Sequence, residues 1–393
     1  MGPLNGFKVL EFAGIGPGPM AAMLLADMGA TVLRLERPEP SGLGLNRPTQ
    51  LNFLNRGRRS VVADLKCPQG VSMALSLLEK SDALIEGFRP GTMERLGLGP
   101  DECLARNPRL VYGRVTGWGQ DGPLAQSAGH DLNYIALSGA LDAIGRRDEP
   151  PTPPLNLVGD YGGAVYLCMG ILAAAIESRR SGLGQVVDAA MVDAATSLMA
   201  STYGLKAAGM HEGPRGTNML DSGAPFYDVY ECLDGNYISI APIEAKFREQ
   251  LFSLIGLPAG MSADAIDRNK WPAMRVQLTA LFKSQTRAYW CQLLEGTDAC
   301  FAPVLSMQEA PNHLHQLSRK GFIEIAGVSQ PAPAPRFSRT VSAMPTPPEK
   351  PGESADVAME EWGFSQAQIE DFRSQGALLT RTDDAERGQG ISK

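Results

Sequence analysis

Residues 8–36 read KVLEFAGIGPGPMAAMLLADMGATVLRLE, and this stretch decides the fold class. Lys8 to Phe12 and Thr31 to Leu35 are short apolar runs that favour buried strands. Between them, a turn rich in glycine and proline leads into an apolar helical run from Met20 to Met28, and Gly29 is suited to end it. A strand, a helix and a strand in this order predict a parallel sheet with a right-handed crossover.

The glycines of this turn do not form a dinucleotide-binding fingerprint. Glu36 ends the second strand, but the third glycine of the motif would fall at Pro19. Arg37 follows Glu36 directly and provides a cation that can stack on an aromatic ring or meet a phosphate. The sequence therefore disfavours a nicotinamide dinucleotide.

The alternation of strand and helix continues along the chain. The runs Val61–Leu65, Ala83–Glu86 and Leu110–Thr116 predict three further strands, with a helix over about residues 69–81. Basic residues recur where successive strands end, and open parallel sheets bind ligands at that edge, so the pattern favours a ligand that carries phosphate. The basic residues at or just after these strand ends are Arg37, Lys66, Arg89 and Arg95, and a further basic cluster at residues 55–60 lies ahead of the strand at 61–65.

The chain changes character in its second half. A Gly-rich apolar helix is expected at about residues 163–178, and a long Ala- and Met-rich helix from Ala189 to Met210. After a linker, Tyr227–Leu233 and Gly235–Ile240 alternate as a β-hairpin. Helices follow to about residue 294, and Glu361–Gln375 predicts a final helix.

Composition limits the classes of protein to consider. At 393 residues and 44% hydrophobic content, we expect an ordinary globular protein of two domains. The net charge of -7 argues against a general nucleic-acid binder. The six cysteines show no zinc spacing and favour a reducing, cytoplasmic location with no metal. We find no signal peptide and no apolar segment long enough to span a bilayer, so no membrane partner is expected.

One short stretch, residues 128–134 (AGHDLNY), is the first candidate site. His130 is one of only four histidines, and Asp131 after it suits a helix N-terminus, where free N–H groups attract negative charge. A histidine beside such an anion site suits proton removal next to a carbonyl. From this stretch alone, a turn whose histidine makes only a local hydrogen bond is the simpler explanation. Asp160, taken singly, is explained as a helix cap.

An ordered set of motifs is more specific than any one of them. The set comprises GIGPGP at 14–19, ADLK at 63–66, EGFRPG at 86–91, TGWGQ at 116–120, GHD at 129–131, GD at 159–160, GAP at 223–225 and PAPAPRFSR at 331–339. In this order the motifs resemble the family III CoA-transferase superfamily, and within it the α-methylacyl-CoA racemases, over nearly the full chain.

The resemblance implies an α/β fold in which a Rossmann-like large domain is joined to a smaller α+β domain, in an interlocked homodimer. The active site would lie between the large domain of one subunit and the small domain of the other. The expected division is a large CoA-binding part at 1–188, a linker helix and loop at 189–222, a small domain at 223–325, and a return segment at 326–393 that joins the large domain.

The resemblance also implies the site residues. The catalytic positions fall on His130, Asp160, Glu244 of the partner subunit, and the backbone N–H of Asp131. The CoA-contacting positions fall on Arg37, Ala63, Asp64, Leu65, Lys66, Gly87, Phe88, Arg89, Arg95, Gly129, Leu132, Asn133 and Tyr134. The acyl-site positions fall on Met191, Met219 and Tyr227, although Met191 is equally well an ordinary core residue.

The presence of both His130 and Asp160 favours racemisation, because inverting a carbon by proton transfer needs acid/base groups on opposite faces. The expected reaction interconverts 2-methylacyl-CoA epimers through a thioester enolate, with acyl-CoA as substrate and no separate cofactor. One alternative is a CoA transferase that uses Asp160 as nucleophile. Another is a CoA-thioester-binding protein without turnover.

Overall fold

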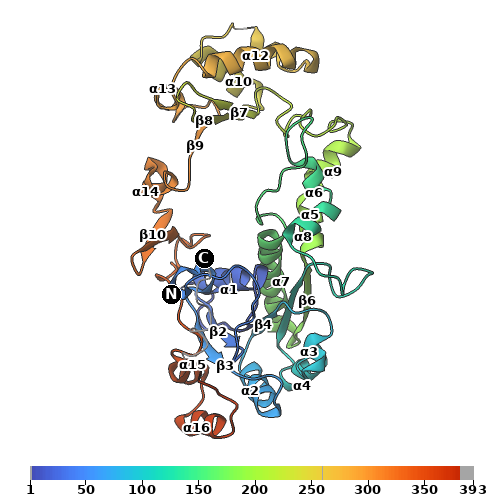
Figure 1. Ribbon diagram of the computed structural model, residues 1–393, viewed down its shortest axis with the longest axis vertical. Helices are drawn as coiled ribbons and strands as arrows, with labels where there is room; N and C mark the ends of the chain where they lie inside the picture. The colour runs from blue at the N-terminus through green and yellow to red at the C-terminus, as the bar shows by residue number, and fades with distance from the viewer. Residues whose placement is uncertain (1, 259, 381–393) are drawn as a thin grey trace, which may run out of the picture. The chain divides into compact units, whose positions relative to one another are not determined.

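The computed structural model describes residues 2–258 and 260–380, and it divides by internal contacts into two compact units (Figure 1). Within the described residues, unit 1 comprises 2–138, 155–198 and 322–380, and unit 2 comprises 139–154 and 199–321. Residues 139–154, which the sequence division placed in the large domain, thus belong to unit 2. Each unit has its own hydrophobic core, so each is described by itself.

Unit 1 is built on a fully parallel sheet, as the βαβ stretch predicts. Its six strands lie in the order β3-β2-β1-β4-β5-β6. The strand order reverses between β1 and β4, and such a switch point opens a crevice at the carboxyl ends of the strands. The strands are β1 (Lys8–Phe12), β2 (Thr31–Glu36), β3 (Arg59–Val62), β4 (Ala83–Glu86), β5 (Val111–Thr116) and β6 (Gln185–Ala190).

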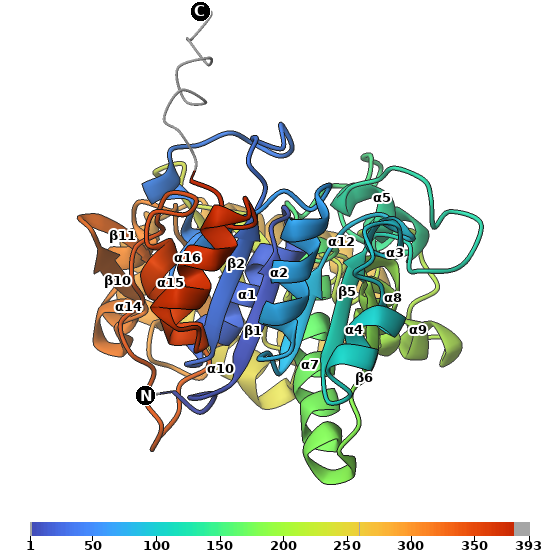
Figure 2. The same cartoon turned by 90° about the horizontal axis from the view of Figure 1, so that it is seen from below.

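Helices cover both faces of this sheet. Side chains alternate along the strands, so that Leu10 belongs to one core and Val9 to the other. The first core receives α2 (Pro68–Leu78), α4 (Pro100–Arg106), α15 (Ala355–Trp362) and α16 (Gln366–Ser374). Figure 2 shows α2, α15 and α16 together on the near side of the sheet. The second core receives α1 (Pro17–Asp27) and α7 (Asp160–Ser181).

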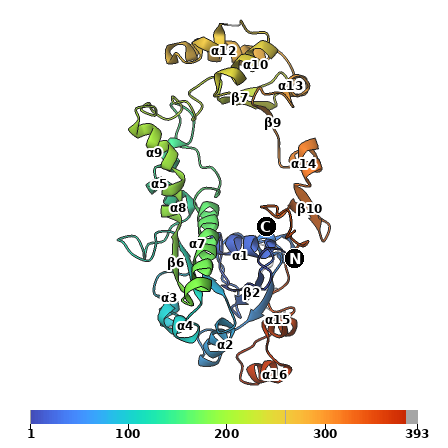
Figure 3. The ribbon, with the colours of Figure 1, turned by 180° about the vertical axis from the view of Figure 1, so that it is seen from behind.

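Helix α7 corrects one expectation from the sequence. By length and composition, α7 is apolar enough to cross a membrane. By these two criteria, the prediction that no apolar segment is long enough to span a bilayer is wrong. Its inner side packs on α1, β5 and β6 (Figure 3). Leu167 and Ile171 on that side are fully buried. Val165, Met169 and Ile176 are exposed on the rest of the helix. Helix α7 is therefore a core helix on one side and an apolar surface on the other.

Two predicted helices are divided differently in the structure. The long helix expected from Ala189 to Met210 is wrong: strand β6 runs to Ala190, and α8 (Met191–Leu198) and α9 (Ala200–Ala207) follow. The final helix expected at Glu361–Gln375 is instead α15 and α16, which are separated at Gly363, where φ is 94°. A left-handed backbone ends a helix, and glycine adopts it without steric cost.

Unit 2 contains a small antiparallel sheet in the order β7-β8-β9. The predicted hairpin is present as β7 (Asp228–Glu231) and β8 (Tyr237–Ile240), and β9 (Phe301–Val304) adds a third strand that was not predicted. The helices are α6 (Ala140–Ala143), α9, α10 (Ala245–Leu254), α11 (Met261–Asp264), α12 (Trp271–Phe282), α13 (Arg287–Leu294) and α14 (Leu314–Arg319). Phe226, Trp271 and Trp290 anchor its core.

Candidate active site

Asp160 lies where the first glycine loop meets the start of α7. It is the first residue of the helix, and a Cβ on Gly16 would lie 3.4 Å from its Oδ2 atom. Gly16 has a φ of 67°, so glycine permits both the turn and the close approach. Asn156 donates from Nδ2 to Asp160 Oδ2 at 3.2 Å. The glycine-rich loop at residues 14–19, which resembles a dinucleotide motif, therefore packs against the Asp160 carboxylate.

His130 lies at the N-terminus of α5 (Asp131–Leu137), and its side chain is exposed. Residues one turn later fix its backbone: Asn133 Oδ1 accepts the His130 N–H at 3.0 Å, and the Tyr134 hydroxyl donates to the Gly129 carbonyl. The Tyr134 ring packs edge-on against Trp118, with centroids 4.8 Å apart. The GHD motif is thus held by α5 and by the tryptophan of the TGWGQ motif.

The Asp131 side chain joins the two helix starts. Its Oδ1 atom accepts the backbone N–H groups of Gly159 and Asp160, each at 2.8 Å. Asp131 is only 6% exposed, so these bonds are made away from solvent. As a result, the N-termini of α5 and α7 lie together, and with them the two residues that the sequence named as acid/base groups.

The charges of His130 and Asp131 both act on the pKa of Asp160. The pKa of Asp160 is raised, mainly by burial and further by the Asp131 charge, while the Asn156 hydrogen bond and the His130 side chain act in the opposite direction. Burial raises the pKa of Tyr134 to about 12, with added contributions from Asp160 and Asp131. A carboxyl group with a raised pKa gives and takes a proton more readily near neutral pH.

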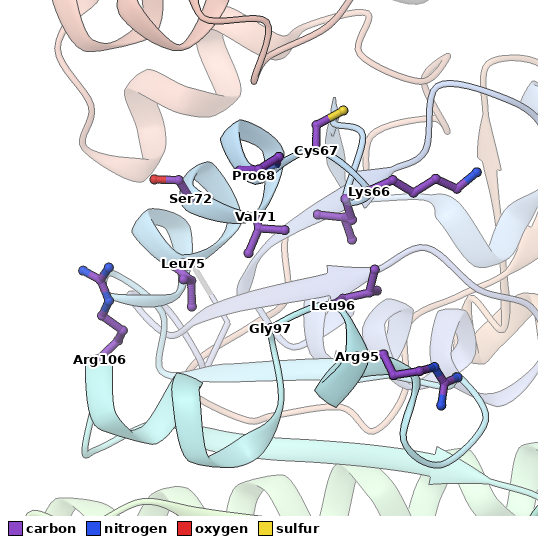
Figure 4. Close-up of a pocket in the computed structure, with 11 residues that line it drawn as sticks. Lys66, Cys67, Pro68, Val71, Ser72, Leu75, Arg95, Leu96, Gly97 and Arg106 are labelled. Atoms are coloured by element: carbon purple, nitrogen blue, oxygen red, sulfur yellow. The ribbon is translucent and has the colours of Figure 1, made fainter.

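A pocket of about 590 Å³ lies beside the edge of the sheet where α2 begins (Figure 4). Leu65, Val71, Leu75 and Leu96 supply apolar wall, and Lys66, Arg95 and Arg106 supply positive charge. Figure 4 shows the Lys66 and Arg95 side chains extending to the same side of the pocket. Two of the predicted CoA-binding cations therefore border one cavity, together with the predicted residue Leu65.

The turn after β4 is fixed by a buried ionic network that sequence reasoning missed. Glu86 accepts the Phe88 N–H at 2.7 Å and the Arg114 Nε–H at 2.7 Å. Arg114 also pairs with Glu94 at 2.8 Å, on the short helix α3 (Thr92–Arg95). The signal in the sequence was an arginine inside the apolar strand VYGRVT. Buried charges are paired, so this arginine implied buried carboxylates nearby.

The arginines of the basic cluster at residues 55–60 form ion pairs within unit 1. Arg56 is buried in an ion pair with Asp27 at 2.6 Å, and Arg58 is buried in a pair with Glu11. Arg59 pairs with Glu361 at 3.0 Å. These arginines are paired with carboxylates within unit 1, so the phosphate prediction depends on the basic residues at the strand ends.

The remaining predicted residues divide between the two units. In unit 1, Arg37, Gly87, Arg89, Leu132 and Asn133 are exposed, Ala63 is buried, and Phe88 packs edge-on against Phe12. Asp64 accepts the Lys66 N–H at 2.9 Å, and Met191 is buried against Gly163 of α7. Unit 2 carries Met219, Tyr227 and Glu244, the last at the N-terminus of α10.

No group of three or more histidine, cysteine, aspartate or glutamate side chains suited to a metal ion occurs among residues 2–258 and 260–380.

Comparison with known proteins gives a consistent result. The model of CoA-transferase family III matches residues 4–353. The alpha-methylacyl-CoA racemase of Mus musculus is 42% identical over 370 residues, which are 93% of this chain and 95% of that protein. The enzyme of that name from Homo sapiens is 42% identical over 376 residues, 94% of this chain and 96% of that one. A crystal structure of a CAIB/BAIF family protein from Brucella suis superposes with a TM-score of 0.76 at 25% identity, covering 92% and 99% of the two chains.

Proposed function

Because this chain belongs to CoA-transferase family III, and is 42% identical over most of its length to two proteins named alpha-methylacyl-CoA racemase, we propose that it is a racemase of 2-methylacyl-CoA thioesters. The reaction interconverts the (2R) and (2S) epimers by moving one proton to and from C2. The observation that carries the proposal is the Asp131 link between α5 and α7, which brings an imidazole and a carboxyl group with a raised pKa into one site.

The proposed mechanism uses these two groups in turn. His130 removes the C2 proton of one epimer, the electron pair passes into the thioester carbonyl, and an enolate forms. Protonated Asp160 then gives its proton to the other face of C2, and the opposite epimer results. In the reverse direction, Asp160 is the base and the His130 imidazolium is the acid. The raised pKa of Asp160 favours its role as a proton donor.

The enolate oxygen needs hydrogen-bond donors. The backbone N–H of Asp131 is the first of α5 and has no acceptor in the described part of the chain. We assign the enolate oxygen to it, because a preorganised N–H stabilises charge that develops in the transition state. Glu244, at the start of α10, is proposed to orient His130 from a partner subunit. The reaction moves only a proton, so we propose no cofactor beyond the CoA of the substrate.

Binding of the CoA moiety is proposed for the carboxyl edge of the sheet. Lys66 and Arg95 border the pocket of about 590 Å³, and Arg37 and Arg89 are exposed just after β2 and β4. Exposed cations of this kind suit phosphate oxygens. Met191, Met219 and Tyr227 are proposed to line the acyl chain, where methionine offers an adaptable apolar surface.

We also propose that the protein works as a homodimer in the cytoplasm. Val165, Met169 and Ile176 form an exposed apolar row on α7, and such surfaces mark sites of association. The six cysteines are all free, which suits a reducing compartment. The net charge of -7 makes nucleic acid an unsuitable partner.

Incubation of each pure epimer of a 2-methylacyl-CoA in deuterated water tests the function. We expect uptake of one deuteron at C2 together with loss of optical purity. His130→Asn and Asp160→Asn should each abolish racemisation in both directions. Each variant should still exchange the C2 proton of the one epimer whose hydrogen faces the remaining base.

Two outcomes would reject the racemase. Transfer of CoA to a free acid without deuterium uptake, with a hydroxylamine-trapped acyl group on Asp160, would identify a transferase, and His130→Asn should then retain activity. Tight binding of CoA thioesters without any exchange would identify a binding protein.

A further inference from the structure

The two helix starts at the site are connected by a side chain, not by their own caps. Helix α7 has Gly159 at its N-cap position, and no side chain of its own caps it. The first N–H groups of a helix need acceptors, and a local serine, threonine or aspartate usually supplies one. Here the acceptor comes from Asp131, the first residue of a different helix, with two bonds of 2.8 Å.

The packing around this connection leaves no room for a local cap. A Cβ at position 159 would lie 2.6 Å from Asp131 Oδ1, so only glycine allows the carboxylate to reach the backbone. Asp131 is 6% exposed, and its Oδ2 atom has no hydrogen-bond partner among the described residues. Burying a charged oxygen without a partner costs stability. Asp131 therefore lowers the stability of the fold in a way that a local helix cap would not.

We propose that the Asp131 carboxylate is a positioning residue that fixes the separation of the two acid/base groups, an inference that rests on the proposed racemase function. His130 is covalently next to Asp131, and Asp160 gives its own N–H to the same carboxylate. One hydrogen bond thus ties the backbone of one base to the backbone of the other.

This connection matters for inversion more than for proton removal. Either base alone can exchange the proton of its own epimer, because that step needs one group in place. Inversion needs both groups placed on the same carbon at once. A misplacement of about 1 Å can cost about 100-fold in rate. Loss of the connection should therefore lower the ratio of inversion to exchange.

The charge of Asp131 has a second, separable effect. It adds to the raised pKa of Asp160, and burial is the larger cause. An asparagine at position 131 keeps the acceptor oxygen and removes the charge, whereas a glutamate keeps the charge and lengthens the side chain. The two substitutions separate geometry from electrostatics.

The experiment measures deuterium uptake and inversion side by side, for each epimer, with the full-length protein. For Asp131→Ala and Asp131→Glu we expect inversion to fall about 100-fold and retained-configuration exchange by less than about tenfold. For Asp131→Asn we expect the wild-type ratio and an acid limb of the kcat profile at lower pH. Asp101→Ala, which removes an exposed first-turn acid of α4, should change neither rate and serves as the control.

Several outcomes would overturn the proposal. Equal losses of inversion and exchange would mean that Asp131 supports folding or the enolate site instead. A wild-type ratio in Asp131→Glu would contradict it even if the alanine variant fails to fold. Absence of both exchange and inversion in the wild-type protein would reject the racemase function itself, which is a distinct result.

Discussion

Two sets of basic residues in unit 1 have opposite surroundings. Those of the first set, Arg56, Arg58 and Arg114, are at most 5% exposed, and each meets a carboxylate. Those of the second set, Arg37, Lys66, Arg89 and Arg95, are exposed at strand ends or just beyond. Both sets lie near strands of the same sheet. The difference shows that the role of a cation depends on whether a buried carboxylate lies within its reach.

The reason is the cost of desolvation. A buried guanidinium loses its water and stays charged only where carboxylates replace it, as Glu11 does for Arg58 and Glu86 for Arg114. An exposed cation keeps its water and can exchange it for the oxygens of a phosphate. The first set should therefore govern stability, and the second set substrate binding.

The largest effect is expected from the first set. Arg114→Ala leaves Glu86 buried without its charged partner, and breaking such a pair costs about 3–5 kcal/mol. We expect a clear fall in the urea midpoint at neutral pH. Arg95→Ala is the matched control and should leave the midpoint unchanged. A loss below about 1 kcal/mol for Arg114→Ala would remove the distinction between the two sets.

Substrate binding should respond in the opposite way. Arg95→Ala and Lys66→Ala should each raise KM for an acyl-CoA about tenfold, since a hydrogen bond to a charged group contributes about 1.5 kcal/mol. The melting temperature should not change. Arg106 borders the same pocket but pairs with Glu79 at 2.9 Å, so Arg106→Ala should change KM less. An equal effect of all three substitutions on KM would show that an ion pair with a carboxylate does not prevent a cation from binding the substrate.

Salt should separate the two sets without any mutation. Exposed charges are screened, with a Debye length of about 10 Å at 0.1 M and about 3 Å at 1 M, whereas buried pairs are screened far less. Raising the salt concentration over this range should increase KM several-fold and leave the urea midpoint almost constant. A parallel change in both would indicate that the buried pairs are open to solvent.

The smallest expected effect is a change in melting temperature when one of two buried carboxylates is replaced. Asp27 is buried beside Arg56, whereas Asp160 is largely buried beside a neutral amide, and the pKa of both is raised by burial. A raised pKa means that protonation favours the folded state, and this advantage is lost as pH rises through the folded pKa. Asp160→Asn should therefore raise Tm by about 1 °C at pH 7 and less at pH 4. Asp27→Asn should lower Tm, because Arg56 loses its partner.

Local sequence patterns were sufficient to predict much of the secondary structure of unit 1. The run from Lys8 to Glu36 predicted its strands almost to the residue, because buried strands and a glycine stop are short-range signals. The partners of the arginines were not predictable in this way. Arg56 pairs with Asp27 and Arg58 with Glu11, which are 29 and 47 residues away in sequence. Nothing near residues 55–60 distinguishes a buried arginine from a free one.

The same limit applies to the site. His130 and Asp160 were identified by motif, but the side chain that joins them was expected to contribute only its backbone. That contact spans 28 residues and depends on how α5 and α7 pack. The prediction of a long helix from Ala189 was also wrong because of a contact distant in sequence. Ala189 and Ala190 pair with Val115 and Thr116 of β5. Sheet pairing outweighs the helix preference of alanine there.

The division of the chain has a consequence for its synthesis. Unit 2 is complete once residue 321 has left the ribosome, and domains fold as units as they emerge. One face of the parallel sheet, however, is covered by Met359, Trp362 and Ile369, which are translated only after unit 2 is complete. The nascent protein must keep Met73 and Leu77 uncovered until then. We expect the chain to depend on chaperones more before these residues are translated than after they have packed on the sheet.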